Sequence, residues 1–298
     1  MKQIVILSGK GGTGKTSLTA AFAHLSQNDL VKMKFVLADA DVDAANLELL
    51  LAPELIEEHE FMGGQVAIID PDLCQGCGIC MQICRFEAIR FDGLFYSIDP
   101  LSCEGCAACH YQCPEAAIRM EQQIAGKWFR SRTRFGPLFH AALRPAQENS
   151  GKLVTMVRQQ ARLLALDDGH QAVLVDGPPG IGCPVISAVS GADLAMIVCE
   201  PTAAGIHDMQ RALETTAHFN IQTTVCINKF DLYPAGTEKI ELYCQQEAIP
   251  VLGRVPFDPL VTEAMAYGEP VTSYLPNAPA SQAIIELWRR IASVLNSS

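Results

Sequence analysis

The chain has 298 residues, of which 49% are hydrophobic, enough for one large α/β domain or for a domain with a small additional module. Its formal net charge of −11 disfavours nonspecific binding to nucleic acid or to an anionic membrane. No apolar run reaches the roughly 18 residues of a membrane helix, and the N-terminus lacks the pattern of a signal peptide. We therefore expect a cytoplasmic protein without stable membrane insertion, in which the twelve cysteines bind metal rather than form disulfides.

The first part of the chain alternates strands with a helix. The apolar stretch "IVIL" at 4–7 predicts a short buried strand, and "TSLTAAFAHLSQ" at 16–27 predicts a helix. A second strand, within "KFVLADAD" at 34–41, ends in carboxylates. This alternation is typical of a parallel sheet with crossover helices.

A block of cysteines interrupts this alternation, which resumes at residue 152. A helix is predicted at 152–166, followed by the strand-bearing stretches "AVLVDGPPG", "LAMIVCEPT", "TTVCINKF" and "IPVLGRVPF" and by an amphipathic helix at 281–295. We predict a mostly parallel, doubly wound α/β domain formed by residues 1–62 and 124–298. A small α+β module at 63–123 is inserted into it.

The stretch "GKGGTGKT" at 9–16 fits the phosphate-binding pattern G-x-x-x-x-G-K-[ST] and lies between a strand and a helix, as the pattern requires. Glycines in such a loop turn backbone N–H groups toward phosphate, and the helix N-terminus adds a partial positive charge. Lys15 is expected to reach the β- and γ-phosphates and Thr16 to bind Mg²⁺. The candidate nucleotide contacts in the loop are Gly9, Lys10, Gly11, Gly12, Thr13, Gly14, Lys15, Thr16 and Ser17.

The lysine directly after the first glycine, Lys10, resembles the "deviant" loop of the MinD/ParA/Mrp superfamily of P-loop ATPases, which includes the nitrogenase iron protein. The resemblance implies that the chain binds and hydrolyses ATP with Mg²⁺. It also implies a dimer in the ATP state, either a homodimer or a heterodimer with a paralogue. In such a dimer Lys10 would contact the nucleotide of the partner.

Two acidic stretches resemble the switches of that superfamily. In "DADVDAAN" at 39–46, the resemblance implies that Asp41 orients the attacking water and that Asp39 lies near the metal. In "LVDGPPG" at 174–180, it implies that Asp176 holds a Mg²⁺-bound water and that the Gly180 N–H contacts the γ-phosphate. The expected catalytic residues are thus Lys10, Lys15, Asp41 and Asp176.

The stretch "NKFD" at 228–231 is also typical of the guanine-specificity motif of GTPases. The resemblance implies instead that Asn228 contacts adenine, with Lys229 beside it. Pro256 and Asp258 of "VPFD" would line the base. GTP stays open as the alternative nucleotide.

Eight cysteines lie between residues 74 and 113 in two copies of C-x₂-C-x₂-C-x₃-C, shifted by 29 residues. Gly76 matches Gly105, and "AIR" occurs in both copies. This block resembles a bacterial ferredoxin with two [4Fe–4S] clusters, in which the fourth cysteine of each copy binds the other cluster. The resemblance implies one cluster on Cys74, Cys77, Cys80 and Cys113 and a second on Cys103, Cys106, Cys109 and Cys84. Two structural zinc sites remain the alternative, although zinc more often joins two C-x₂-C pairs across a longer gap.

Two residues near these motifs raise separate hypotheses. Arg85 follows Cys84 where the ferredoxin pattern has proline, and its charge would raise the potential of the nearby cluster. Cys183, seven residues after Asp176, could ligate a cluster shared across a dimer or could be structural.

Three functions fit these observations. The first is electron transfer through the two clusters to a redox partner, controlled by nucleotide state. The second is assembly or delivery of iron–sulfur clusters or metallocofactors to an acceptor protein, as in Mrp-like carriers. The third is a MinD/ParA-like positioning ATPase with a redox sensor. The intact ferredoxin pattern favours stably bound clusters and hence the first function.

Overall fold

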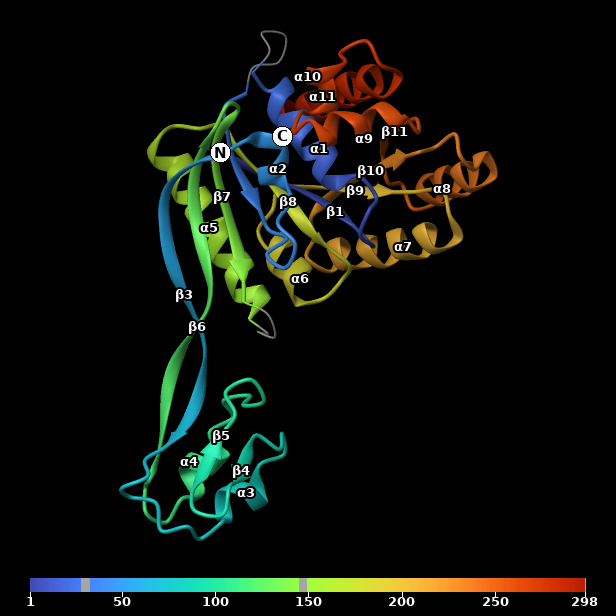
Figure 1. Ribbon diagram of the computed structural model, residues 1–298. Helices are drawn as coiled ribbons and strands as arrows, with labels where there is room; N and C mark the ends of the chain where they lie inside the picture. Colours follow the sequence, from blue (N-terminus) through green and yellow to red (C-terminus); the bar gives the residue numbers. More distant parts are fainter. Residues whose placement is uncertain (28–32, 145–148, 298) are drawn as a thin grey trace. The chain divides into compact units, whose positions relative to one another are not determined.

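The computed structural model describes residues 1–27, 33–144 and 149–297 and divides the chain into two compact units (Figure 1). Unit 1 comprises Met1–His59, Trp128–Ala142 and Ser150–Ser298, and unit 2 comprises Glu60–Lys127 and Leu143–Asn149. Two long strands, β3 (Glu54–Ile69) and β6 (Ile118–Thr133), each have residues in both units. Unit 2 thus adds Leu143–Asn149, which the predicted boundaries assigned to the C-terminal part.

The large sheet has nine strands in the order β11-β10-β9-β1-β8-β2-β7-β6-β3. Its parallel pairs include β1 with β8 and β9, and β2 with β7 and β8. The predicted α/β class with a mostly parallel sheet is confirmed. The other seven strands are β1 (Lys2–Ser8), β2 (Phe35–Asp39), β7 (Gly136–Leu143), β8 (Ala172–Pro179), β9 (Leu194–Cys199), β10 (Gln222–Asn228) and β11 (Val251–Val255).

Helices pack on both faces of the sheet in unit 1. They are α1 (Lys15–Leu25), α2 (Leu47–Leu51), α5 (Ser150–Asp167), α6 (Cys183–Val189), α7 (Ala203–His218), α8 (Pro234–Gln246), α9 (Pro259–Ala266), α10 (Val271–Tyr274) and α11 (Pro279–Ser297). Within the described ranges, none of the helices is long and apolar enough to cross a membrane.

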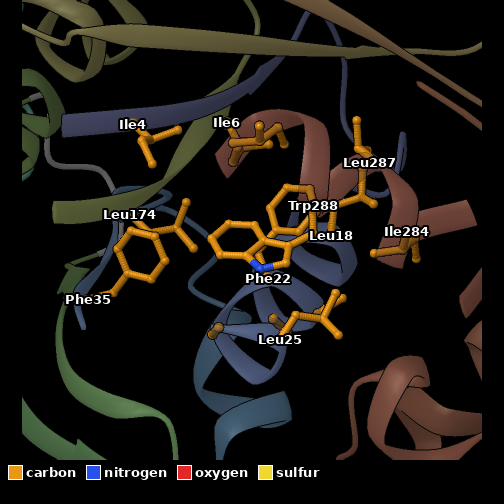
Figure 2. Packing of buried hydrophobic residues seen from close by; sticks show 14 of the residues in the cluster. Ile4, Ile6, Leu18, Phe22, Leu25, Phe35, Leu174, Ile284, Leu287 and Trp288 are labelled. Atoms are coloured by element: carbon orange, nitrogen blue, oxygen red, sulfur yellow. The ribbon is translucent and has the colours of Figure 1, made fainter. Parts of the chain in front are cut away.

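The core of unit 1 explains why the first strand is apolar on both faces. Ile4 and Ile6 of β1 point toward α1 and α11 (Figure 2). The Trp288 ring lies between Phe22 of α1 and Phe35 of β2, with ring centroids 5.5 and 5.7 Å away. Helices on both faces bury both sides of the strand, so the alternation expected of a half-exposed strand is absent.

Unit 2 repeats its own backbone at a shift of 29 residues. The helices α3 (Ile79–Ile83) and α4 (Ala108–Gln112) are equivalent, and left-handed φ angles recur at 76 and 105, 78 and 107, and 87 and 116. The Asp70 N–H donates to the Ala117 carbonyl at 2.7 Å, and the equivalent Asp99 N–H donates to the Ala88 carbonyl at 2.8 Å. The repeats therefore exchange equivalent hydrogen bonds. A short antiparallel pair, β4 (Ile89–Phe91) with β5 (Tyr96–Ile98), completes unit 2.

Candidate functional site

The phosphate loop of the sequence follows β1 and leads into α1. Gly12 and Gly14 have left-handed φ angles of 78° and 94°. A Cβ at Gly14 would lie 2.5 Å from Asn228 Nδ2, so a side chain there would collide with the end of β10. The Thr13 hydroxyl is buried and has no hydrogen-bond partner among the described residues. An unsatisfied donor in this loop fits a site that receives an anionic ligand.

Asp176, near the end of β8, lies beside the start of α1. Its carboxylate accepts hydrogen bonds from Thr16 Oγ1 at 2.6 Å and Thr19 Oγ1 at 3.1 Å. Burial raises the pKa of Asp176 to about 6, against the opposing effects of Lys15 and both threonines. Thr19 did not stand out in the sequence because it lies outside the loop pattern. One turn of helix after Lys15 brings it onto the same carboxylate.

Asp39, at the end of β2, is fully buried and holds the loop that leads to α2. It accepts from Asp41 N at 3.1 Å and from Leu47 N, the first residue of α2, at 3.0 Å. Burial, with the Asp176 charge second, raises the pKa of Asp39 well above its usual value. Burial also raises the pKa of Asp41, which Lys15 opposes. Lys15 thus acts on two of these three carboxylates, Asp41 and Asp176.

Gly180 lies just beyond β8 with a left-handed φ of 91°. Its N–H donates to the Ser8 carbonyl at 3.0 Å. A contact from this N–H to a γ-phosphate would require that bond to break, so the second switch would have to rearrange.

Glu200 is a residue of the site that the sequence reasoning missed. Its two carboxylate oxygens pair with Lys10 Nζ at 2.8 Å and Lys229 Nζ at 2.5 Å. Burial tends to raise the pKa of Glu200, but the two lysines outweigh it and the pKa is lowered. Its position in the sequence could have indicated this role, because Glu200 directly follows β9, the strand that pairs with β1. Carboxyl ends of adjacent parallel strands converge at one edge of a sheet.

A cavity of about 160 Å³ lies beside the loop, lined by residues that include Asn228, Lys229, Pro256 and Asp258. The Asn228 amide donates to the Thr13 carbonyl at 2.7 Å and thereby also holds the loop. Asp258 accepts from Leu260 N at 3.0 Å and from Ala280 N at 3.3 Å, so its carboxylate serves as a helix cap. Asp258 can therefore line the cavity, but its carboxylate is already engaged.

Unit 2 contains two cavities, each lined by four cysteines. One has a volume of about 20 Å³ and is lined by residues that include Cys74, Cys77, Cys80 and Cys113. The other has the same volume of about 20 Å³ and is lined by residues that include Cys84, Cys103, Cys106 and Cys109. In each, three thiols come from one repeat and the fourth from the other. The Ala117 N–H also donates to Cys113 Sγ at 3.4 Å, the kind of bond that tunes a metal-bound thiolate.

The other thiols are placed differently. Within the described residues, no three His, Cys, Asp or Glu side chains form a group that could hold a single metal ion. Cys199, Cys226 and Cys244 are buried in unit 1, whereas Cys183 is exposed at the first residue of α6. Arg85 is exposed next to Cys84.

A comparison with known protein families matches residues 4–271 to the CobQ/CobB/MinD/ParA nucleotide binding domain. The chain belongs to this family. It is 36% identical over 227 residues to an uncharacterized protein of Methanocaldococcus jannaschii, covering 76% of this chain and 78% of the relative. An uncharacterized ATP-binding protein of the same archaeon is 26% identical over 295 residues, covering 97% of this chain and 86% of that protein.

Two further similarities are more distant. An iron–sulfur cluster carrier protein of Pyrococcus horikoshii is 27% identical over 138 residues, which are 41% of this chain and 45% of the carrier. The structure of the septum site-determining protein MinD of P. horikoshii, complexed with Mg-ADP, matches with a TM-score of 0.60 at 18% identity, covering 98% of this chain and 96% of its own. The chain therefore has the fold of MinD/ParA P-loop ATPases.

Proposed function

We propose that this MinD/ParA-family protein is a dimeric ATPase that couples its nucleotide state to electron transfer through two [4Fe–4S] clusters. The observation that carries the proposal is the pair of four-cysteine cavities, in which each repeat contributes three thiols to one cavity and one to the other. A redox protein would be the partner that gives or receives the electron.

The nucleotide part of the proposal rests on the loop and its carboxylates. Lys15 and the backbone of residues 9–17 would bind the phosphates, and Thr16 would bind Mg²⁺ beside Asp39 and Asp176. Asp41 would orient the attacking water. The cavity at Asn228 and Lys229 would receive adenine, which agrees with the ATP-binding relative. Asp231 is the aspartate of "NKFD" that would have to bind a guanine base. One of its carboxylate oxygens already accepts a hydrogen bond from Phe257 N at 2.7 Å, which disfavours GTP.

The donor set of unit 2 fits a polynuclear cluster. Four thiols line each cavity, and cysteine thiolates are the usual ligands of such clusters. When bound, a [4Fe–4S] cluster supplies one-electron transfer. The chain supplies the thiolates, the apolar surroundings from Ala67, Ile89 and Ile118, and the N–H bond to Cys113.

Anaerobic purification followed by iron and acid-labile sulfide assays tests the proposal. Two clusters require about eight iron and eight sulfide per chain. Stoichiometric zinc without sulfide would contradict the cluster assignment while leaving the ATPase intact. Calorimetry in the same preparation should give tighter binding of Mg-ATP than of Mg-GTP.

A second function, cluster delivery, is favoured by one observation, the partial similarity to an iron–sulfur cluster carrier protein. The two functions differ in what happens to the clusters during turnover. A carrier loses its iron and sulfide to an apo-acceptor as ATP is hydrolysed, whereas an electron-transfer protein keeps both. Iron retention measured after many ATP turnovers, with an apo-ferredoxin present, separates them.

A further inference from the structure

Three polar side chains of unit 1 form a row of contacts outside the nucleotide site. The Glu48 carboxylate on α2 lies 3.2 Å from His140 Nδ1 on β7. His140 Nε2 lies in hydrogen-bonding distance, 3.1 Å, of the Ser131 hydroxyl on β6. Ser131 and His140 are 1% and 7% exposed, whereas the Glu48 side chain is 40% exposed, so the row runs from a half-exposed carboxylate into the protein interior.

The partners determine the tautomer of His140. A carboxylate has no proton to donate, so the ring proton of His140 is placed on Nδ1, which faces Glu48. Burial lowers the pKa of His140, against the opposing charge of Glu48, which favours the neutral ring. The neutral ring then accepts at Nε2, and the Ser131 hydroxyl donates to it.

This order of groups resembles a Ser-His-acid nucleophile, but the burial excludes that role. A reacting carbonyl must approach the serine oxygen, and Ser131 is 1% exposed. The Phe129 ring also stacks on His140, with centroids 4.9 Å apart. The row is therefore better suited to transmit position than to carry out chemistry.

One end of the row is joined to the first switch. Asp39 accepts from the N–H of Leu47, the residue that precedes Glu48 in α2. The pairing of β2 with β7 sets Ala38 opposite Phe139, so Asp39 and His140 each follow a residue of that pair. One hydrogen bond, one peptide unit and the Glu48–His140 contact thus connect Asp39 to His140.

The other end of the row lies on β6. Ser131 belongs to the part of this strand in unit 1, and the same strand continues through Ile118–Lys127 in unit 2. A displacement of α2 would act on Ser131 through the Glu48–His140 contact and the buried His140–Ser131 hydrogen bond. Loss of that hydrogen bond would leave buried polar atoms unsatisfied.

We propose that His140 is a positioning residue that links α2, the helix next to the first switch, to β6. A displacement of Asp39 and α2 would then displace the strand that continues into unit 2. The inference rests on the proposed nucleotide switch, because α2 must respond to nucleotide for the tie to transmit anything. The inference names the side chains through which a displacement would pass from α2 to β6, and these lie outside the loop, the switches and the cysteine cavities.

Hydrogen exchange of the holoprotein, measured by mass spectrometry with Mg-ADP and with a non-hydrolysable Mg-ATP analogue, tests the inference. In the wild type we expect a nucleotide-dependent difference in α2 and in the unit 2 part of β6. His140→Phe keeps an aromatic ring against Phe129 but removes the hydrogen bond to Ser131 and the polar contact with Glu48. It should keep the difference in α2 and lose the difference in β6. Ser131→Ala, a smaller change, should do the same.

His59→Phe is the matched control. His59 stacks on Trp128 of β6 with centroids 4.2 Å apart and pairs with Glu57, so its replacement should leave the β6 difference in place. Persistence of that difference in both His140→Phe and Ser131→Ala overturns the inference. If the wild type responds in α2 but not in β6, the inference is overturned while the proposed switch stands. A wild type without any response in α2 overturns the proposed switch and the inference together.

Discussion

At the scale of single residues, Asp176 gives a pH dependence with a definite sign. Its pKa is raised from 3.8 to about 6, mainly by burial, so between these values the folded state binds more protons than the unfolded one. The stability that Asp176 contributes is therefore present at acid pH and is lost as pH rises through about 6, by on the order of 3 kcal/mol in total. Asp176→Asn removes this loss.

Urea unfolding of the Mg²⁺-free protein, at pH values from about 5 to about 7, measures the effect. As pH rises, the free energy of unfolding of Asp176→Asn should increase relative to that of the wild type. Carboxyls with lowered pKa values, such as Glu200 and Glu269, act in the opposite direction but are common to both proteins. The Asp176 charge also raises the pKa of Asp39, so the difference between the two proteins reports on this pair of carboxyls together. A difference that does not change with pH would contradict the raised pKa of Asp176.

Glu200 gives a second prediction at this scale. It neutralises part of the charge of Lys10 and Lys229 beside the phosphate loop. Glu200→Gln leaves two less compensated ammonium groups there, so Mg-ATP and Mg-ADP should both bind several-fold tighter, with a steeper loss of affinity in salt. Glu238→Gln, an exposed change on α8, is the control. Unchanged affinity and salt dependence in calorimetry would mean that Glu200 only braces the loop.

At the scale of elements, the repeat of unit 2 predicts which cysteines fail together. Cys113 lines the cavity of Cys74, Cys77 and Cys80. Under the proposed cluster assignment, Cys113→Ser and Cys74→Ser should therefore alter the same cluster, although 39 residues separate them. Cys84→Ser should alter the other. EPR of the reduced variants distinguishes the two signals, and an effect of Cys113→Ser on the same signal as Cys84→Ser would contradict the crossed assignment.

The elements also show which features were predictable from the sequence. The strands of the parallel sheet could be predicted from unbroken apolar runs, because a strand that is buried on both faces consists almost entirely of apolar residues. The long strand β6 was missed because "IRMEQQIAGKWFRSRT" is mostly polar and only its pairing with β7 and β3 makes it a strand. The row from Glu48 to Ser131 joins residues far apart in the chain, and no local pattern reports such pairing.

At the scale of the whole molecule, the deviant loop predicts ATP-dependent self-association. Under the proposed function Lys10 crosses to the partner's nucleotide, whereas in the structure it pairs with Glu200 of its own chain. Lys10→Ala should bind Mg-ATP as a monomer and fail to dimerise or hydrolyse it. Lys15→Ala should fail already at binding. Sedimentation with a non-hydrolysable analogue measures this, and a Lys10→Ala protein that dimerises normally would contradict a role across the interface.

Under the proposed function, nucleotide state should also change the properties of the two clusters assigned to unit 2. In the sequence, residues 60–127 of unit 2 lie between the predicted first switch at 39–46 and the predicted second switch at 174–180. Segments ordered by a γ-phosphate are a common source of such coupling. A coupling of about 1–3 kcal/mol corresponds to roughly 5–150-fold in partner affinity or an equivalent change in cluster potential.

The comparison is between the Mg-ADP state and a non-hydrolysable Mg-ATP state, both anaerobic and with dimerisation verified. The measured quantities are cluster potential, the rate at which a chelator removes iron, and the rate of electron transfer to a small dye. Each reports on unit 2 without needing the physiological partner. A tethered ferredoxin that only brings electrons near an independent ATPase would leave all three unchanged. That result would restrict the effect of ATP to docking of the partner.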